Sequence, residues 1–474
     1  MSSQQVDRLS GLPEDVRFHI LSLMPAKFAG RTSVLSKRWR FSWMFVTNLD
    51  YNSKKTMSSK YIDRLSGLPK HIRSHILSLM PTRNAIKTSV LSQTWRYTWM
   101  LVTNLNFDDY SIHDFKHFET FVDCVLKHCI TSQLNLFRLH QFRWSVGKPT
   151  LSNWINEAVR LNVRELDIKV FQLGLPLSLF TCKTLTNLRL SHSEDDKSGW
   201  ECPCLVYLPC LKNLDVNVFG NPFVNAFKLI SGSPILESLS LVISSHNGEE
   251  DYVFNIPTLK RLNLYLHDRS NTNKVVLNVP NLESLFVGGK MCSLFVMEDV
   301  SSLVAATIKC HSIFGRGDMW VELLKGVSGV KSLSIGNLSS ILLPTFPIMS
   351  TNMKQLVLQG FWHPKEVVGV LESCPGLEHL HIQMFAEFDW IEPKLVPGCM
   401  LTKLTSIKIS NCIWSNHEMK FLEYMLGNAE VLKTVTITWV KSWVKEESQL
   451  RAKLLKLPRA SKYCQVNFPR DLFK

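Results

Sequence analysis

The 474-residue sequence predicts an α/β protein in which small helical units precede a parallel stack of short strands and a mixed helix–strand segment follows. Three observations lead to this prediction. The first 49 residues recur once, a leucine-rich pattern returns many times from about residue 160, and the pattern changes again after about residue 398. Internal repeats of this kind indicate a modular chain, and the length allows two to four modules.

The N-terminal segment is duplicated. Residues 1–49 align with residues 57–105 at a constant offset of 56, without gaps, and 32 of the 49 positions are identical. A polar linker over residues 51–62 joins the two copies. The first copy is called copy one below, and the second is called copy two.

The sequence of each copy predicts three short helices. In copy one, Pro13 suits the first position of a helix, and Val16, Ile20 and Leu23 follow at helical spacing. The third helix carries Trp39. A unit of this size has little core of its own and leaves an apolar face, so we expect it to bind a partner.

Two stretches, LPEDVRFHILSLMPAKFAGRTSVLSKRWR and LPKHIRSHILSLMPTRNAIKTSVLSQTWR, resemble the F-box over about 43 residues in each copy. The resemblance implies docking onto a Skp-type adaptor, and through it onto cullin. The implied adaptor-binding residues are Leu12, Pro13, Ile20, Leu21, Val34, Leu35 and Trp39 in copy one, and Leu68, Pro69, Ile76, Leu77, Val90, Leu91 and Trp95 in copy two.

The charge distribution agrees with that implied partner, because the adaptor family is acidic. The chain has a net charge of +14, and residues 1–105 hold 16 Lys and Arg against 5 Asp and Glu. Two alternatives remain open for this segment. The apolar residues could be the core of a small bundle, and the stretches KRWRFSW and WRYTW could bind nucleic acid. Their basic residues interleave with packing residues rather than forming one basic cluster, so we expect no nucleic-acid partner.

From about residue 160, one pattern recurs at spacings of 21–28 residues: apolar, two variable, apolar, one variable, apolar. Leu236, Leu239 and Leu241 are one instance. This period predicts an irregular leucine-rich-repeat solenoid, in which each repeat adds one strand to a parallel sheet. Strand alternation turns a second set of side chains outward, and we expect these to form a substrate-binding face. They are Asp167, Arg189, Asp215, Arg261, Asn263, Tyr265, Phe286, Gln355, Val357, His379, His381 and Lys408.

The phrases GSPILESLSL, NVPNLESLFV and SCPGLEHLHI are similar to the repeats of plant F-box proteins, and the closing LPRAS and CQVNF resemble their FBD segment. The resemblance implies a horseshoe-shaped repeat body capped by an α+β FBD segment. The predicted divisions are F-box copy one at 7–50, a linker at 51–62, F-box copy two at 63–106, a connector at 107–160, repeats at 161–397 and the FBD-type segment at 398–470.

The sequence contains no catalytic constellation: GxxxxGK[ST], HExxH and GxSxG are absent. Cys202, Cys204 and Cys210 lie close together, but no second paired set completes a zinc site, so we expect free thiols, no metal and no cofactor. No apolar run reaches the roughly 18 residues of a membrane helix, and no secretory signal opens the sequence, so an intracellular location in cytoplasm or nucleus is expected.

The predicted function is that of a non-catalytic substrate receptor in a Skp–cullin–F-box ubiquitin ligase. Such a receptor has the adaptor and an unknown protein substrate as partners, and we expect no membrane partner. An alternative is a leucine-rich-repeat interaction scaffold, or a relic, that does not bind the adaptor.

Overall fold

The computed structural model divides the chain into two compact units. Unit 1 comprises residues 1–212 and 228–234, and unit 2 comprises residues 213–227 and 235–474. The structure describes residues 67–91, 93–110, 115–193, 200–219, 223–244, 251–267, 274–290, 293–312, 317–336, 346–360, 362, 364–383, 390–412, 416–439 and 447–468. Copy one, with its implied adaptor-binding residues, lies outside this part of the chain.

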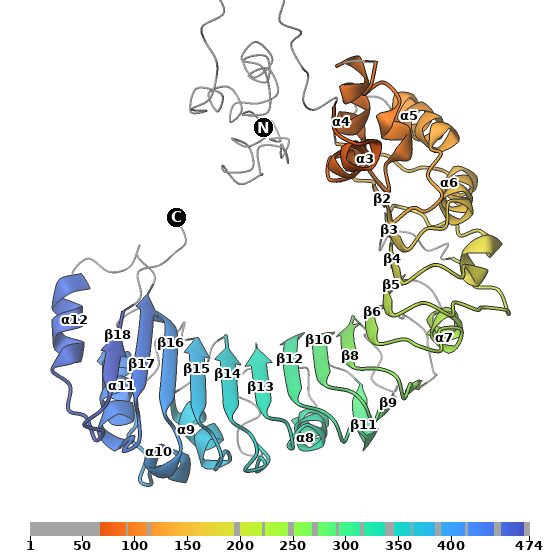
Figure 1. Ribbon diagram of the computed structural model, residues 1–474. Coiled ribbons are helices and arrows are strands. Elements are labelled where there is room, and N and C mark those ends of the chain that lie inside the picture. Colours follow the sequence, from red (N-terminus) through yellow and green to blue (C-terminus); the bar gives the residue numbers. More distant parts are fainter. Residues whose placement is uncertain are drawn as a thin grey trace, which may run out of the picture. The chain divides into compact units, whose positions relative to one another are not determined.

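Unit 1 contains a helical region followed by a parallel sheet in the order β1-β2-β3-β4 (Figure 1). Its helices are α3 (Lys70–Ser78), α4 (Thr82–Lys87), α5 (Phe115–His128) and α6 (Lys148–Arg160), with 3-10 turns η3 (Thr88–Val90), η4 (Thr98–Leu101) and η5 (Leu177–Thr181). Its strands are β1 (Asn104–Asp108), β2 (Leu136–His140), β3 (Glu165–Lys169) and β4 (Asn187–Ser191).

Copy two differs from the predicted three α-helices. Helix α3 begins at Lys70 with Pro69 as its N-cap, one residue later than the sequence suggested. The 3-10 turn η3 continues α4 at the end of the second predicted helix, and where the third helix was expected the chain forms only the short 3-10 turn η4. The segment is short and rich in β-branched and aromatic residues, which are weak helix formers, so tighter local turns replace a third α-helix.

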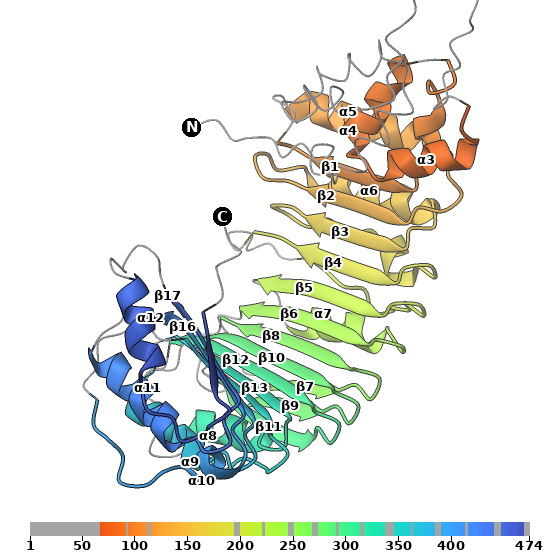
Figure 2. The same cartoon turned by 60° about the vertical axis from the view of Figure 1, so that its left-hand side comes forward.

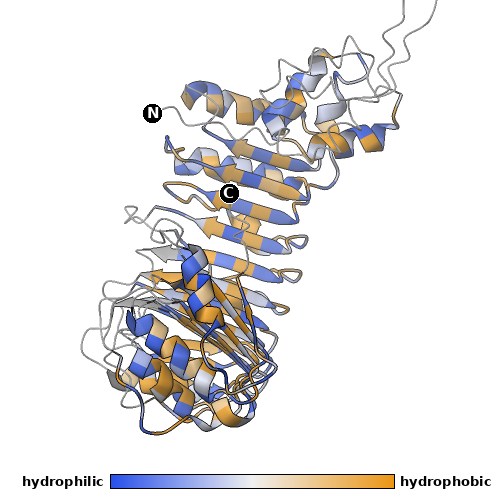
Figure 3. Ribbon diagram, turned by 90° about the vertical axis from the view of Figure 1, so that its left-hand side faces the viewer, coloured by the Kyte–Doolittle hydropathy of each residue, from blue (hydrophilic) through white to orange (hydrophobic). Residues whose placement is uncertain are grey.

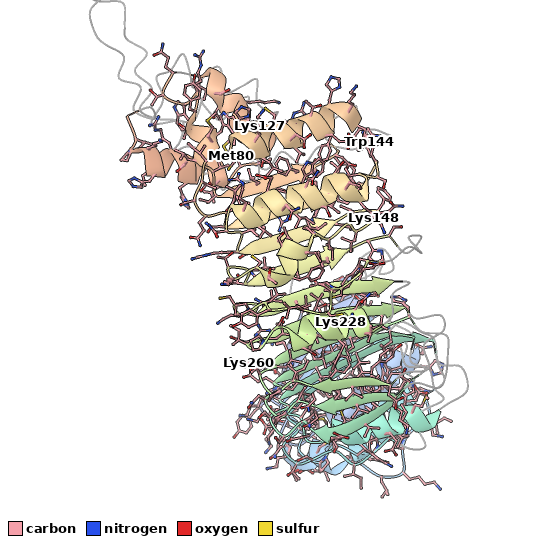
Figure 4. All side chains as sticks on the ribbon, turned by 90° about the vertical axis from the view of Figure 1, so that its right-hand side faces the viewer. Met80, Lys127, Trp144, Lys148, Lys228 and Lys260 are labelled. Atoms are coloured by element: carbon pink, nitrogen blue, oxygen red, sulfur yellow. The ribbon has the colours of Figure 1, made fainter. Side chains whose placement is uncertain are left out.

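Helices α5 and α6 are amphipathic and cover the strands of unit 1. Leu151, Trp154, Ile155 and Ala158 are the buried residues of α6 and recur at the three- and four-residue spacing of one helix face. The Trp154 indole donates a hydrogen bond to the Asp123 carboxylate at 2.6 Å, which joins α6 to α5. Figure 4 shows this helix side of unit 1, with Lys127 on α5 and Lys148 at the start of α6.

Unit 2 continues the repeat pattern as a parallel sheet in the order β5-β6-β8-β10-β12-β13-β14-β15-β16-β17-β18 (Figure 2). The strands are β5 (Asn213–Phe219), β6 (Ser238–Ser244), β8 (Arg261–Leu266), β10 (Ser284–Lys290), β12 (Ala305–Ser312), β13 (Ser332–Gly336), β14 (Gln355–Gln359), β15 (His379–Gln383), β16 (Ser406–Cys412), β17 (Thr434–Trp439) and β18 (Gln465–Asn467). The helices are α8 (Gly317–Gly326), α9 (Pro364–Glu372), α10 (Gly398–Thr402), α11 (Asn416–Asn428) and α12 (Glu447–Leu455). Helix α7 (Phe223–Ser231) has residues in both units.

The core of unit 2 follows the leucine register. Leu239 pairs with Leu262, which pairs with Leu285, and all three are at most 1% exposed. Inward leucines therefore stack strand upon strand, while the alternate positions face away from them. The same alternation of hydrophobic and hydrophilic residues is visible along the strands in Figure 3.

A second parallel sheet, in the order β11-β9-β7, was not predicted. It consists of β7 (Tyr252–Asn255), β9 (Lys274–Asn278) and β11 (Leu294–Asp299), and α8 packs against β11. Alternate residues of β7 are buried, among them Tyr252 and Phe254. In these repeats short strands therefore take the place that helices take elsewhere in the unit.

Two predicted boundaries fall inside continuous structure. The predicted boundary between copy two and the connector falls within β1, and the connector contains all of β2, so the parallel sheet of unit 1 begins near residue 104. At the other end, β16, β17 and β18 pair in parallel within the sheet of unit 2. The mixed helix–strand character expected of the C-terminal segment is present in α11, β17 and α12.

Candidate functional site

Copy two has a small core of its own. Leu77 of α3 and Ala85 of α4 are each 1% exposed, and Trp95 is 5% exposed. The Arg73 guanidinium donates to the carbonyl of Thr94 at 2.9 Å and lies 5.9 Å from the centre of the Trp95 ring. Leu77 and Trp95 therefore belong to the packed interior rather than to the predicted contact surface, because a unit this small uses its largest apolar groups for its core.

The other implied adaptor-binding residues of copy two are accessible. Leu91 is 64% exposed, Pro69 is exposed, and Leu68 and Ile76 are half-buried. The side chain of Val90 lies outside the described residues, as do all the implied adaptor-binding residues of copy one: Leu12, Pro13, Ile20, Leu21, Val34, Leu35 and Trp39.

Three further exposed apolar residues were missed by the family pattern. They are Ile72, Leu79 and Tyr97, and Leu79 and Tyr97 are 69% and 61% exposed. Like Pro69 and Leu91, they are apolar side chains of copy two that its own core does not cover. Helical spacing had indicated two of these positions, because Val16 and Leu23 of copy one match Ile72 and Leu79, which lie on α3 and at its C-cap.

Copy two is joined to the first strand by hydrogen bonds from the backbone. The N–H of Thr103 donates to the Ser78 hydroxyl at 3.0 Å, and the N–H of Asn106 donates to the Thr82 hydroxyl at 2.7 Å. Ser78 and Thr82 are both buried. Strand β1 is the first strand of its sheet, so these hydroxyls satisfy N–H groups that no preceding strand could reach.

On the strand face of unit 1, Asp167 is buried, in contrast to the exposed position expected for it. Its carboxylate accepts hydrogen bonds from Arg138 Nε at 2.8 Å and His140 Nε2 at 3.0 Å, and Arg189 Nη1 lies 3.9 Å away. The alternation was predicted correctly, but long side chains on neighbouring strands cover the shorter aspartate.

Three causes act on the ionisation of Asp167. Burial raises the pKa of the Asp167 carboxyl, whereas hydrogen bonds from His140 and Arg138 and the charges of these groups lower it more strongly, so the pKa lies below its ordinary value. The carboxylate is therefore ionised and acts as the centre of a cation cluster. Its hydrogen bonds join β2 to β3.

The remaining predicted strand-face residues lie on the face as expected. Arg189, Arg261, Asn263, Tyr265, Gln355, His379 and Lys408 are exposed, and Asp215, Phe286, Val357 and His381 are half-buried. The His381 ring makes a 2.9 Å hydrogen bond with the Ser410 hydroxyl. Burial and the nearby Lys408 charge lower the pKa of His381, so the imidazole is mostly neutral at neutral pH.

The described part of the chain offers no group of His, Cys, Asp and Glu side chains arranged for a metal ion. Burial raises the pKa of both Cys202 and Cys399 to about 11, which keeps these thiols protonated and unreactive at neutral pH.

A polar depression of about 700 Å³ in unit 1 is lined by groups such as Arg164, Glu165 and Lys183. Within the described ranges, no helix is both long and apolar enough to span a membrane.

Family models match most segments of the chain. The F-box domain model matches residues 9–47 and 65–106, so both copies are recognised. The model described as FBD-associated F-box protein At5g56370, LRR repeats, matches residues 151–307, and the FBD model matches residues 392–437.

Curated relatives match the chain over most of its length. An F-box/LRR-repeat protein of Arabidopsis thaliana is 30% identical over 468 residues, covering 85% of this chain and 88% of the relative. An F-box/FBD/LRR-repeat protein of the same plant is 29% identical over 454 residues, with coverages of 87% and 97%. An FBD-associated F-box protein is 28% identical over 430 residues, with coverages of 86% and 100%.

Proposed function

The chain belongs to the plant F-box/FBD/LRR-repeat protein family, and from this premise we propose that it is a substrate-receptor subunit of a Skp–cullin–F-box ubiquitin ligase. The observation that carries the proposal is the exposure of five apolar side chains of copy two: Pro69, Ile72, Leu79, Leu91 and Tyr97. An exposed apolar surface on a small helical unit has the character of a protein-binding site. The adaptor is the partner that an F-box implies.

In this proposal the contact surface differs from the residues first implied by the F-box pattern. Pro69 and Leu91 contact the adaptor, with half-buried Leu68 and Ile76 beside them. Leu77 and Trp95 hold the surface in place from within the core. Copy one is a second F-box, which has its own Leu-Pro pair, Leu12 and Pro13.

The repeat body is a horseshoe-shaped solenoid that recruits a protein substrate. The FBD segment caps the last strand of this solenoid. The outward residues of the strands, among them Arg261, Tyr265 and Lys408, form the recruiting face. A receptor of this kind needs no catalytic residues of its own, because ubiquitin transfer takes place on other subunits of the ligase.

An adaptor pull-down tests the proposal. Replacing Leu12, Pro13, Leu68 and Pro69 together by alanine is expected to abolish co-purification with a Skp-type adaptor, while circular dichroism of the variant remains that of the native chain. Unchanged pull-down by the folded variant would instead favour the alternative, a leucine-rich-repeat scaffold or relic without adaptor binding.

A further inference from the structure

The strand face of unit 2 lacks carboxylates from β8 to β18. None of the outward positions that the structure describes on these strands is Asp or Glu, whereas Arg261, Lys309 and Lys408 are cationic. Two glutamates near the starts of strands are already paired, since Glu237 lies 3.2 Å from Lys260 and Glu378 lies 2.7 Å from Lys354. The face is therefore positively charged in solution.

An aromatic pair lies on the same face. The ring centres of Tyr265 and Phe286 are 5.1 Å apart, and Tyr265 is 36% exposed. Both rings lean over Gly288, where a Cβ atom would come within 2.8 Å of Phe286 and 3.0 Å of Tyr265. Glycine at this position lets the rings lie against the sheet and present a broad apolar surface.

The register places the aromatic pair and the cations along a common path. Phe286, Thr307, Ser334, Val357, His381 and Lys408 pair successively from strand to strand. With about 4.8 Å between neighbouring strands, Phe286 and Lys408 are roughly 24 Å apart along the sheet. Lys309 pairs with Gly288 and lies beside the aromatic pair. An extended segment of about seven residues spans this path.

We propose that this path binds a protein segment in which Asp or Glu residues accompany an apolar side chain. The apolar side chain packs on Tyr265 and Phe286, and the carboxylates approach Lys309 and Lys408. The proposal rests on the proposed function, because it gives the chemical class of the substrate segment that the receptor recruits. Among the described residues, no carboxylate lies within ion-pair distance of Lys309 or Lys408.

The spacing of the cations favours carboxylates over phosphate. Phosphate recognition uses clustered arginines that donate in pairs to one group, whereas Lys309 and Lys408 are single charges on strands far apart in the sheet. Well-spaced single charges match several carboxylates distributed along a segment. Nucleic acid needs a continuous basic footprint, which two lysines and one arginine do not supply.

The experiment uses the full chain co-purified with a Skp-type adaptor. A random 16-residue peptide library displayed on phage is selected on this complex, and the selected peptides are then measured against two double variants. Lys309→Glu with Lys408→Glu reverses the charge of the path. Lys420→Glu with Lys453→Glu makes the same change on exposed lysines of α11 and α12 and serves as the matched control.

The expected result is enrichment of peptides that combine Asp or Glu with an aromatic or aliphatic residue. Their affinity should fall at least tenfold on the Lys309/Lys408 variant, remain unchanged on the control, and weaken with added salt. No enrichment, a neutral or basic consensus, or equal binding to both variants would overturn the proposal. So would tighter binding of a phosphoserine version of the selected peptide or of a single-stranded oligonucleotide.

The two proposals fail separately in this design. If the chain does not co-purify with the adaptor, the proposed function fails, and the peptide selection can still be carried out on the chain alone. If the adaptor binds normally but the acidic peptides do not distinguish the variants, the proposed function stands and the substrate class is wrong.

Discussion

Thr82 accepts a hydrogen bond from the backbone N–H of Asn106 at 2.7 Å and thereby joins helix α4 to strand β1. The Thr82 side chain is 1% exposed, so this contact is shielded from water. At the matching position copy one carries Ala26, which has no hydroxyl to accept such a bond. The two copies therefore differ in sequence at the position through which copy two bonds to β1.

Replacing Thr82 by alanine should loosen the contact between copy two and β1. The buried N–H of Asn106 then loses its acceptor, which costs about 1–3 kcal/mol. Amide hydrogen exchange of the full chain should become roughly tenfold or more faster at Asn106. Ala26→Thr in copy one is the control and should leave exchange in β1 unchanged. Identical exchange in the Thr82→Ala variant and the native chain would show that the hydroxyl is dispensable.

Leu77 and Leu91 belong to the same F-box copy, but their burial predicts a large loss of stability on mutation of Leu77 and a small one on mutation of Leu91. Leu77→Ala removes a side chain that is 1% exposed and should lower the stability of copy two by about 2–5 kcal/mol. Leu91→Ala removes one that is 64% exposed and should change stability by less than about 0.5 kcal/mol.

Adaptor binding should depend directly on Leu91, although its replacement hardly changes stability. In titrations with copy one inactivated at Leu12 and Pro13, Leu91→Ala should reduce affinity for the adaptor at least tenfold although the chain stays folded. Thermal unfolding and binding are measured on the same samples. Native affinity in the Leu91→Ala variant would remove Leu91 from the contact surface.

Asp167 predicts a pH-dependent contribution to stability. Its pKa in the folded chain is below the value of about 3.9 expected for an unfolded chain, so the ionised carboxylate stabilises the fold above about pH 4. This contribution is lost as the pH falls from there through the lower folded-state pKa. Native chain and Asp167→Asn should therefore differ most in free energy of unfolding above about pH 4 and converge below it.

Urea unfolding followed by tryptophan fluorescence at about pH 5.5 and about pH 3 measures this difference. Glu423→Gln, which changes an exposed carboxylate on α11, is the control and should give little difference at either pH. A gap between native chain and Asp167→Asn that widens at about pH 3 would contradict the assignment.

The parts of the fold that rest on periodicity were predictable, because inward leucines such as Leu239 and Leu262 must repeat for the strands to share a core. The sheet of β7, β9 and β11 was not, since short strands and short helices have similar apolar patterns between repeats. Strands β1 and β2 were missed because helix-rich segments separate them and weaken the repeat.

The exposure of the candidate site residues was also only partly predictable from the sequence. Alternation along β3 correctly placed Asp167 on the strand face, but its burial depends on Arg138 and His140, which come from another strand. Likewise, the F-box pattern included Leu77 and Trp95 but did not show that both side chains face inward. Contacts between distant parts of the chain decide exposure, and a single sequence does not state those contacts.

Copy two is the F-box that should position a substrate for ubiquitination. It packs on β1 through Ser78 and Thr82, whereas copy one precedes it on a linker over residues 51–62. Ubiquitin transfer requires adaptor and substrate to be held in a fixed relation, and from its polar sequence we expect the linker to hold copy one in no single relation to the substrate. A chain of residues 57–474 is therefore expected to fold and to support transfer.

Separate inactivation of the two copies tests this expectation. One variant carries Leu12→Ala and Pro13→Ala, and the other carries Leu68→Ala and Pro69→Ala, so that each change has the other as its matched control. Ubiquitination of a captured substrate should fall at least tenfold in the copy-two variant and remain within about twofold in the copy-one variant, because Ser78 and Thr82 hold copy two on the sheet. Copy one keeps Glu14 and Asp15 near its first helix and could bind the adaptor as tightly by itself. Adaptor affinity is therefore measured beside transfer, and greater loss of transfer in the copy-one variant would show that docking on β1 does not select the working F-box.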